Sequence, residues 1–110
     1  MKVRLIKRKS IEDFAIQNAA SRSSIRIWLT LLKNADWTEP GDINETFGSA
    51  DLLDDGSNRI VFNIAGNNFW MICKYHFGII RVHLYIKWIG THAEYTKLCD
   101  DNKQYTVDAY

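Results

Sequence analysis

The sequence has few of the residues, such as cysteines for disulfides or metal sites, that small folds use in place of a large core. Its 110 residues include two cysteines and one proline. Cys73 and Cys99 have neither metal-ligand spacing nor a disulfide pattern, and the setting of Cys73 is typical of a small, reduced core residue. The chain also lacks an apolar run of roughly 18 residues, the length of a membrane helix, and its first residues, MKVRLIKRKS, lack the apolar segment of a signal peptide. We therefore expect a cytoplasmic protein without a membrane partner.

Motifs for metal and cofactor chemistry are missing as well. No set of Cys, His or carboxylate residues has the spacing of a zinc site. No glycine-rich loop precedes a predicted helix, and there is no nucleophile elbow. The sequence therefore predicts neither a metal nor a nucleotide cofactor.

What the chain does have is enough apolar sequence for one core and an uneven distribution of charge. Apolar residues make up 46% and charged residues 25% of the chain, which is typical of a single globular domain. The net charge of +1 combines +6 over residues 1–35, seven acids and no base over residues 36–58, and +4 over residues 59–99. This pattern is compatible with a cationic groove and an acidic far side. Scattered solvated charge explains it equally simply.

The most regular pattern is the alternation of apolar and polar residues over residues 59–95. If Gly66-Asn67 and Phe77-Gly78 are turns, three antiparallel strands follow and their side chains divide between two faces. In this register Lys74 lies opposite Arg81, and Trp70 lies opposite Tyr85. The predicted core face consists of Ile60, Phe62, Ile64, Phe69, Met71, Cys73, Tyr75, Ile80, Val82, Leu84, Ile86 and Trp88. The predicted open face consists of Arg59, Val61, Asn63, Trp70, Ile72, Lys74, Arg81, His83, Tyr85 and Lys87.

The segments around this block indicate what covers the core face. Residues 3–8 resemble a short strand, and helical spacing predicts one helix over about residues 11–20 and a second that follows the serine cluster at 21–24. Short helical turns are predicted at residues 42–47 and in THAEYTKL, and residues 100–110 are predicted to be a frayed polar tail. The sequence therefore predicts one α+β domain over residues 1–99, with an N-terminal strand and a helical hairpin packed on one face of a mainly antiparallel sheet.

Because helices can cover only one face, the other face is where we expect function. Lysine and arginine bind phosphate, aromatic rings stack on unpaired bases, and RNA cleavage needs groups that move the 2′-hydroxyl proton and stabilise charge on phosphorus. Two of the candidates also have a structural interpretation. His83 is then only a tolerated strand residue, and His92 is a capping or packing residue. His76 is predicted to be an exposed hairpin residue. The candidate residues are Arg59, Lys74, Arg81, His83, Tyr85, Lys87, His92 and Tyr95.

Three short motifs carry a resemblance to a known family. The segments VFNIAGN at residues 61–67 and IGTHAEY at residues 89–95, with ADW at residues 35–37 upstream, resemble the HigB toxins of bacterial type II toxin-antitoxin modules, within the RelE superfamily. The resemblance implies a RelE-like microbial RNase fold. It also implies an mRNA endoribonuclease that acts on message at the ribosome through the 2′-hydroxyl and is neutralised by a HigA-like helix-turn-helix antitoxin.

If the protein is such a nuclease, the candidate residues divide into roles. Phosphate binding and charge stabilisation fall to Lys87, Arg81 and Lys74, and His92 and Tyr95 are the candidates for proton transfer or base positioning. We expect Tyr85 and Trp70 to stack on bases, and Arg59 and His83 complete the predicted RNA-binding set.

The chain departs from the family pattern at places that bear on catalysis. Family members commonly read close to GNKYRL after the first turn, whereas this chain has Asn68 and Trp70 where a lysine and an arginine are expected. Lys87 replaces an arginine and loses its bidentate phosphate geometry. Two alternatives to a full nuclease therefore stay open: a catalytically weakened module that binds RNA, the ribosome or the antitoxin, and a structural subunit without RNA contact.

Overall fold

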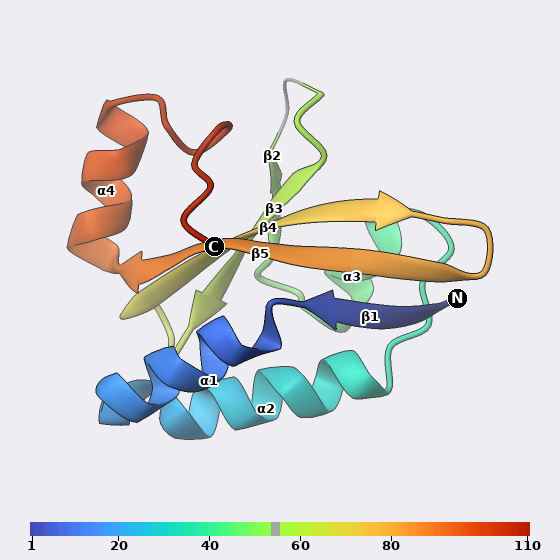
Figure 1. Cartoon of the computed structure of the whole chain (residues 1–110), viewed down its shortest axis with the longest axis horizontal. Helices are drawn as coiled ribbons and strands as arrows, with labels where there is room; N and C mark the ends of the chain where they lie inside the picture. Colours follow the sequence, from blue (N-terminus) through green and yellow to red (C-terminus); the bar gives the residue numbers. More distant parts are fainter. Residues whose placement is uncertain (54–55) are drawn as a thin grey trace.

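The fold is a five-stranded sheet covered on one face by helices (Figure 1). The structure is a computed structural model that describes residues 1–53 and 56–110. In the sheet order β1-β5-β4-β3-β2, strand β1 runs parallel to β5 and the other neighbours pair antiparallel. The predicted α+β fold with a mainly antiparallel sheet is confirmed. The elements are β1 (Lys2–Ile6), α1 (Arg8–Gln17), the 3-10 turn η1 (Ala19–Ser21), α2 (Arg22–Lys33), α3 (Gly41–Thr46), β2 (Asp51–Leu53), β3 (Arg59–Ile64), β4 (Phe69–Phe77), β5 (Arg81–Thr91) and α4 (His92–Asp100).

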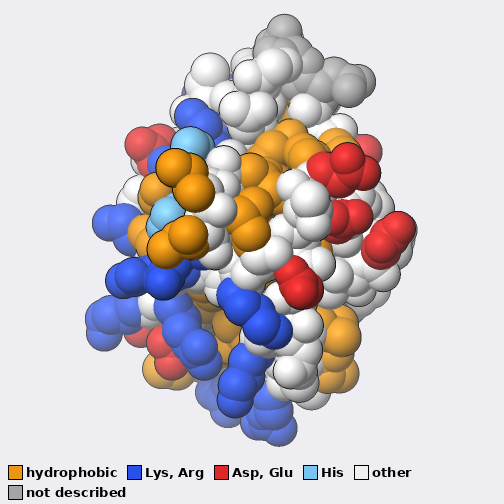
Figure 2. All heavy atoms as spheres, turned by 90° about the vertical axis from the view of Figure 1, so that its right-hand side faces the viewer, with side chains coloured by type: hydrophobic (Ala, Val, Ile, Leu, Met, Phe, Trp, Pro, Cys, Tyr) orange, Lys and Arg blue, Asp and Glu red, His pale blue; other side chains and the backbone are white. Residues whose placement is uncertain are grey.

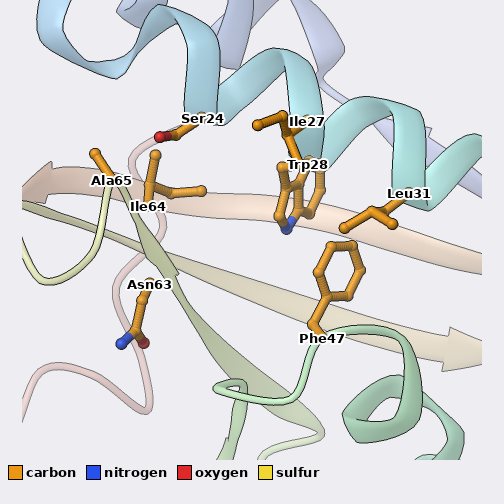
Figure 3. Close-up of a pocket in the computed structure, with 8 residues that line it drawn as sticks. All are labelled: Ser24, Ile27, Trp28, Leu31, Phe47, Asn63, Ile64 and Ala65. Carbon is orange, nitrogen blue, oxygen red and sulfur yellow. The ribbon is translucent and has the colours of Figure 1, made fainter.

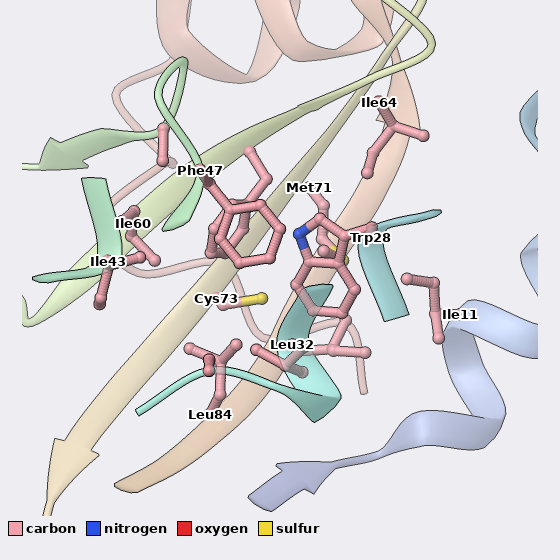
Figure 4. Close-up of a cluster of buried hydrophobic side chains, with 14 of the residues drawn as sticks. Ile11, Trp28, Leu32, Ile43, Phe47, Ile60, Ile64, Met71, Cys73 and Leu84 are labelled. Atoms are coloured by element: carbon pink, nitrogen blue, oxygen red, sulfur yellow. The ribbon is translucent and has the colours of Figure 1, made fainter. Parts of the chain in front are cut away.

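The core lies between the sheet and helices α1 to α3, and aromatic rings form its centre. Trp28 of α2 stacks on Phe47 with ring centroids 5.5 Å apart and meets the edge of Phe62 at 5.3 Å (Figure 4). Ile25, Trp28 and Leu32 are the buried residues of α2, at the helical spacing that the sequence predicts. Cys73 is a free, fully buried cysteine, and burial raises the pKa of its thiol, so it packs as an inert side chain.

A β-bulge at Lys87 changes the faces at the end of β5. Ile72 pairs with Trp88 and Cys73 pairs with Ile86, which leaves Lys87 as the extra residue. Beyond the bulge Ile89 is buried in the core, and Trp88 lies with Ile72 on the opposite face. The prediction that Trp88 belongs to the core was wrong, because a one-residue insertion exchanges the two faces of a strand.

The hairpin between β4 and β5 turns two residues later than the sequence predicts. Its tip is Ile79 and Ile80, which are 98% and 75% exposed, so Ile80 is not a core residue. The amide of Gly78 donates to the carbonyl of Arg81 at 3.0 Å, and a Cβ on Gly78 would lie 2.9 Å from that oxygen, so the turn requires glycine there.

The later turn changes the register but leaves most faces as predicted. Lys74 pairs with Tyr85 and not with Arg81, and Trp70 pairs with Gly90 and not with Tyr85. Up to Ile86 the shift is an even number of residues, so each side chain stays on its predicted face.

The C-terminal segment crosses the face that the sequence predicts to be open. The guanidinium of Arg59, on β3, donates to the carbonyls of Val107 at 2.7 Å and Gln104 at 3.3 Å. The amide of Ala109 donates to the carbonyl of Lys87, on β5, at 2.8 Å. A segment that binds both strands must cross β4 between them (Figure 1). We call residues 101–110 the C-terminal tail; it is docked, whereas the sequence predicted it to be frayed.

Docking of the tail removes three residues from the predicted open face. Val61 and Ile72 are fully buried, and Arg59 is 6% exposed. The apolar side chains of Val61 and Ile72 therefore form a second, smaller packed layer beneath the tail and α4.

Candidate functional site

The part of the second face that stays open is a groove across β4 and β5. Lys74, His76, Tyr85 and Lys87 line it, and its volume is about 390 Å³. The strand register explains the grouping: Lys74 pairs with Tyr85, and His76 pairs with His83. We call these five residues the cationic groove. It brings together four of the predicted site residues, Lys74, His83, Tyr85 and Lys87.

Charge in the groove is basic, with one acidic contact from the tail. Lys87 is 20% exposed, and its Nζ lies 3.2 Å from Oδ1 of Asp108 and 5.8 Å from the ring centroid of Tyr85. None of the four residues that line the groove is acidic. In Figure 2 basic side chains gather on the left and lower part of the molecule, two histidines lie above them beside hydrophobic side chains, and most of the acidic side chains lie to the right. This arrangement suits an anionic ligand.

A second group of rings lies further along β4, where α4 begins. Trp70 stacks on Tyr95 with centroids 4.9 Å apart and an interplanar angle of 7°, and Trp88 lies 6.1 Å from Tyr95. The indole Nε1 of Trp70 donates to Nδ1 of His92 at 2.9 Å. We call these four residues the ring cluster. Since Trp70 and Lys74 are four strand positions apart, the cluster lies about 13 Å from the groove's Lys74.

The contacts in the ring cluster define the chemical state of two predicted site residues. Because Nδ1 of His92 accepts a hydrogen bond, its neutral ring carries the proton on Nε2 and presents a donor to solvent. Burial is the main cause that raises the pKa of Tyr95, and its hydroxyl therefore stays protonated at neutral pH. Tyr95 is a hydrogen-bond donor and a stacking surface here.

A capping box places His92 at the start of α4. The hydroxyl of Thr91 accepts from the amide of Glu94 at 3.2 Å, and Oε1 of Glu94 accepts from the amide of Thr91 at 2.8 Å. The amide of His92 donates to the carbonyl of Asn68 at 3.1 Å, which joins the helix to the β3–β4 turn. These bonds orient the first turn of α4 towards Trp70.

Thr91→Ala is expected to lower the free energy of unfolding by about 1 kcal/mol, because the substitution removes one half of the capping box. Chemical denaturation followed by circular dichroism measures this change. Thr106→Ala, at an exposed position of the tail, is the matched control and is expected to change stability by less than about 0.5 kcal/mol. Equal stability of the two variants would show that the box contributes nothing.

Two predicted site residues lie outside both groups. Arg59 is buried beneath the tail, where burial lowers the pKa of its guanidinium and both of its bonds go to tail carbonyls. Arg81 lines a different groove of about 390 Å³ between β1 and α2, together with Arg4, Arg8 and Lys33. The structure therefore separates Arg81 from Lys87, whereas Arg59 pairs with Lys74 across β3 and β4 but is covered by the tail.

A pocket on the helical side of the sheet is a poor candidate for catalysis. Its volume is about 190 Å³, and none of its lining side chains is an acid, a base or a thiol (Figure 3). The residues that line it are Ser24, Ile27, Trp28, Leu31, Phe47, Asn63, Ile64 and Ala65.

Sequence reasoning missed His76 as a residue of the site. Strict alternation from Trp70 through Ile72 and Lys74 places His76 on the same face, and the structure pairs it with His83 there. The turn predicted at Phe77-Gly78 obscured this alternation, because it placed His76 at the end of the hairpin.

Comparison with protein families identifies the family to which this fold belongs. The family model of the HigB toxin, a RelE-like toxic component of a toxin-antitoxin system, matches residues 21–98. The chain belongs to the HigB toxin family. Both motifs that carry the resemblance, at residues 61–67 and 89–95, lie within the match. A search of curated proteins gave no match.

Family membership makes this chain the toxin of a toxin-antitoxin system, with an antitoxin as its partner. The cationic groove and the ring cluster lie wholly within the HigB match, whereas the C-terminal tail lies beyond its end at residue 98. Among the described residues, no helix is long and apolar enough to span a membrane. The tail that covers Arg59 therefore lies outside the matched residues.

Proposed function

We propose that this HigB-family toxin is a ribosome-associated mRNA endoribonuclease that inhibits translation in the cytoplasm. The observation that supports it best is the cationic groove: two lysines, a tyrosine and two histidines meet on one open sheet face, and the lining contains no acid. Such a surface attracts a phosphodiester and supplies groups that move protons beside it. In this proposal cleavage proceeds by attack of the 2′-hydroxyl and uses no metal.

Lys74 and Lys87 bind the phosphate at the site of cleavage in this proposal. Their side chains enter the groove from adjacent strands, so an anion between them meets positive charge from two directions. As charge grows on the phosphoryl oxygens, these fixed cations stabilise the transition state more than the ground state.

The ring cluster holds the bases next to the cleaved phosphate. Tyr95 already covers one face of the Trp70 indole, so Trp70 offers its other face to a base. Nε2 of His92 adds a donor for a base edge or a phosphate oxygen, because Trp70 occupies Nδ1.

The groove between β1 and α2 extends the electrostatic surface for RNA. Arg4, Arg8, Lys33 and Arg81 line it without an acid among the lining residues, and Lys2 pairs with Arg81 across the strands. We assign Arg81 to phosphate binding away from the reacting bond, where it contributes to affinity and to salt dependence. The implied partners are mRNA, the ribosome and a HigA-like helix-turn-helix antitoxin.

The test is induction of the toxin without its antitoxin, followed by primer extension on cellular mRNA. Growth arrest together with new 5′ ends in translated messages is the expected result. Arrest without new 5′ ends, in the presence of toxin that binds ribosomes, would overturn the nuclease and leave translation as the target.

A binding module of the same fold is the second candidate, and two observations favour it. Lys87 is paired with Asp108, and the position where relatives present an arginine holds Trp70, whose indole N–H is committed to His92. Both features reduce the number of free cations near a phosphate. Primer extension separates the candidates, because a module that only binds leaves messages intact.

A further inference from the structure

Two histidines face each other directly across β4 and β5 in the cationic groove. His76 pairs with His83 in the strand register, their ring centroids are 6.2 Å apart and the rings are inclined by 28°. Tyr85 lies two residues further along β5, with its ring centroid 6.3 Å from that of His83. Two imidazoles at this separation can each bond a different oxygen of one phosphodiester placed over them.

The surroundings of the two rings differ. His76 is exposed, whereas His83 is half-buried and its Nδ1 is buried without a hydrogen-bond partner among the described residues. Buried polar atoms in folded proteins are nearly always bonded, and an exception points to a ligand or a chemical role. Because this Nδ1 is shielded from solvent, an RNA in the groove meets His83 through Nε2, whereas His76 is exposed.

Two lysines lie on one side of the pair, one on each strand. Lys74 lies two residues before His76 on the same face of β4, and Lys87 reaches the groove from β5. The groove therefore holds two proton-transfer groups and two fixed cations, which is the set of groups that metal-independent cleavage of RNA needs.

We propose that His83 and His76 are the general base and general acid of RNA cleavage, an assignment that rests on the proposed nuclease function. Neutral His83 accepts the proton of the 2′-hydroxyl at its Nε2 as that oxygen forms a bond to phosphorus. The bond from phosphorus to the 5′-oxygen breaks, and protonated His76 gives its proton to this leaving oxygen. The products are a 2′,3′-cyclic phosphate and a 5′-hydroxyl, and exchange with water restores both rings.

The first experiment compares His76→Gln and His83→Gln with the wild-type toxin on mRNA bound to ribosomes. We expect each variant to lose about a hundredfold or more in kcat with KM changed less than about threefold, because general acid–base catalysis contributes 10²- to 10⁴-fold. Lys9→Gln, on the exposed surface of α1, is the control for a change of side chain away from the groove. Thermal unfolding checks that the variants fold; His76 is exposed, so its variant is expected to melt as the wild type does.

The second experiment separates acid from base and both from structural roles. A message with sulfur in place of the 5′-oxygen at the cleaved bond has a leaving group that needs no proton, so His76→Gln is expected to recover and His83→Gln is not. If both variants cleave as the wild type does, or if neither lost activity is restored by the sulfur substrate, the assignment of the two histidines is overturned. The proposed nuclease function then remains intact. If the wild-type toxin does not cleave ribosome-bound mRNA at all, the nuclease proposal falls and the pair falls with it.

A different observation, the docking of the C-terminal tail, carries a second inference. Oδ1 of Asp108 lies 3.2 Å from Nζ of Lys87, and the next amide, that of Ala109, donates to the carbonyl of the same lysine. Arg59 anchors the tail further back through the carbonyls of Gln104 and Val107. A carboxylate is thus held on a groove lysine by backbone bonds on both sides of it.

We infer that the tail competes with RNA for Lys87, which again rests on the proposed function. The Asp108 carboxylate neutralises the ammonium group and repels a phosphate oxygen, so an RNA phosphate binds Lys87 more strongly once Asp108 has left. The tail lowers RNA affinity in this toxin, and its release exposes the full cationic surface.

The binding test uses fluorescence anisotropy with a 2′-O-methyl oligonucleotide, which the toxin cannot cleave. Asp108→Asn is expected to lower the Kd about two- to fivefold beyond Asp100→Asn, the range for removal of one partly exposed ion pair. Asp100→Asn removes the same charge from an exposed position at the end of α4 and controls for net charge. On a Lys87→Gln background the two aspartate variants are expected to bind equally.

Hydrogen exchange at the amide of Ala109 gives an independent readout. We expect RNA to speed this exchange in the wild-type toxin, because displacement of the tail breaks its bond to Lys87. The competition is overturned if RNA binds while the Ala109 amide stays protected, or if the two aspartate variants gain the same RNA affinity. RNA binding itself is then left intact. Failure of every variant to bind the oligonucleotide counts against the RNA-directed function, and the competition is then overturned with it.

Discussion

Lys87→Ala is expected to lower mRNA cleavage about a hundredfold, the usual effect of removing one preorganised group that stabilises charge in the transition state. Lys87 is the cation at the bulge of β5, where the strand turns its side chain into the groove between Tyr85 and Asp108. Cleavage of ribosome-bound mRNA and relief of growth arrest on induction both measure the effect.

Lys103→Ala is the matched control for this prediction. Lys103 is an exposed tail lysine outside the cationic groove, and we expect its variant to cleave within about twofold of the wild type. A Lys87→Ala toxin that folds and arrests growth as strongly as the Lys103→Ala toxin removes Lys87 from the mechanism.

Ile72→Ala is expected to cost about 2 to 5 kcal/mol of unfolding free energy, the range for truncation of a buried isoleucine. Ile72 is fully buried on the second face, where the tail crosses β4 between Arg59 and Lys87. Urea denaturation of the purified variant measures the loss.

Ile79→Ala at the hairpin tip is the control, because Ile79 is 98% exposed and its truncation is expected to change stability by less than about 0.5 kcal/mol. The pair of variants also tests the docking of the tail. If Ile72→Ala were as stable as Ile79→Ala, the second face would be open in solution and Asp108 would not be held at Lys87.

The sequence was a good guide wherever one local rule decides the outcome. Periodicity placed Ile25, Trp28 and Leu32 on one stripe of α2, and the structure buries all three against the sheet. Alternation sorted β3, most of β4 and β5 up to Ile86 onto the correct faces. The HigB motifs at residues 61–67 and 89–95 gave the family, which the match over residues 21–98 confirms.

The sequence was a poor guide where distant segments had to be placed against one another. The Ile79-Ile80 tip carries no turn signal of its own, so Phe77-Gly78 was the better turn by composition and the register of Lys74 and Trp70 was wrong. The bulge at Lys87 likewise leaves no mark in the alternation, yet it moves Trp88 to the face of Ile72.

Among the candidate residues the sequence alone named a basic and aromatic set, and its motifs named the family. Side-chain type and spacing along one strand are local properties, and they fixed which residues point away from the helices. Only the tertiary structure decided which of them meet. Long-range pairing set His76 against His83 and moved Arg81 to the β1 edge, and docking of the tail buried Arg59 and placed Asp108 on Lys87. Such contacts depend on strand register and on the path of a segment some twenty to fifty residues away, and no local pattern encodes either.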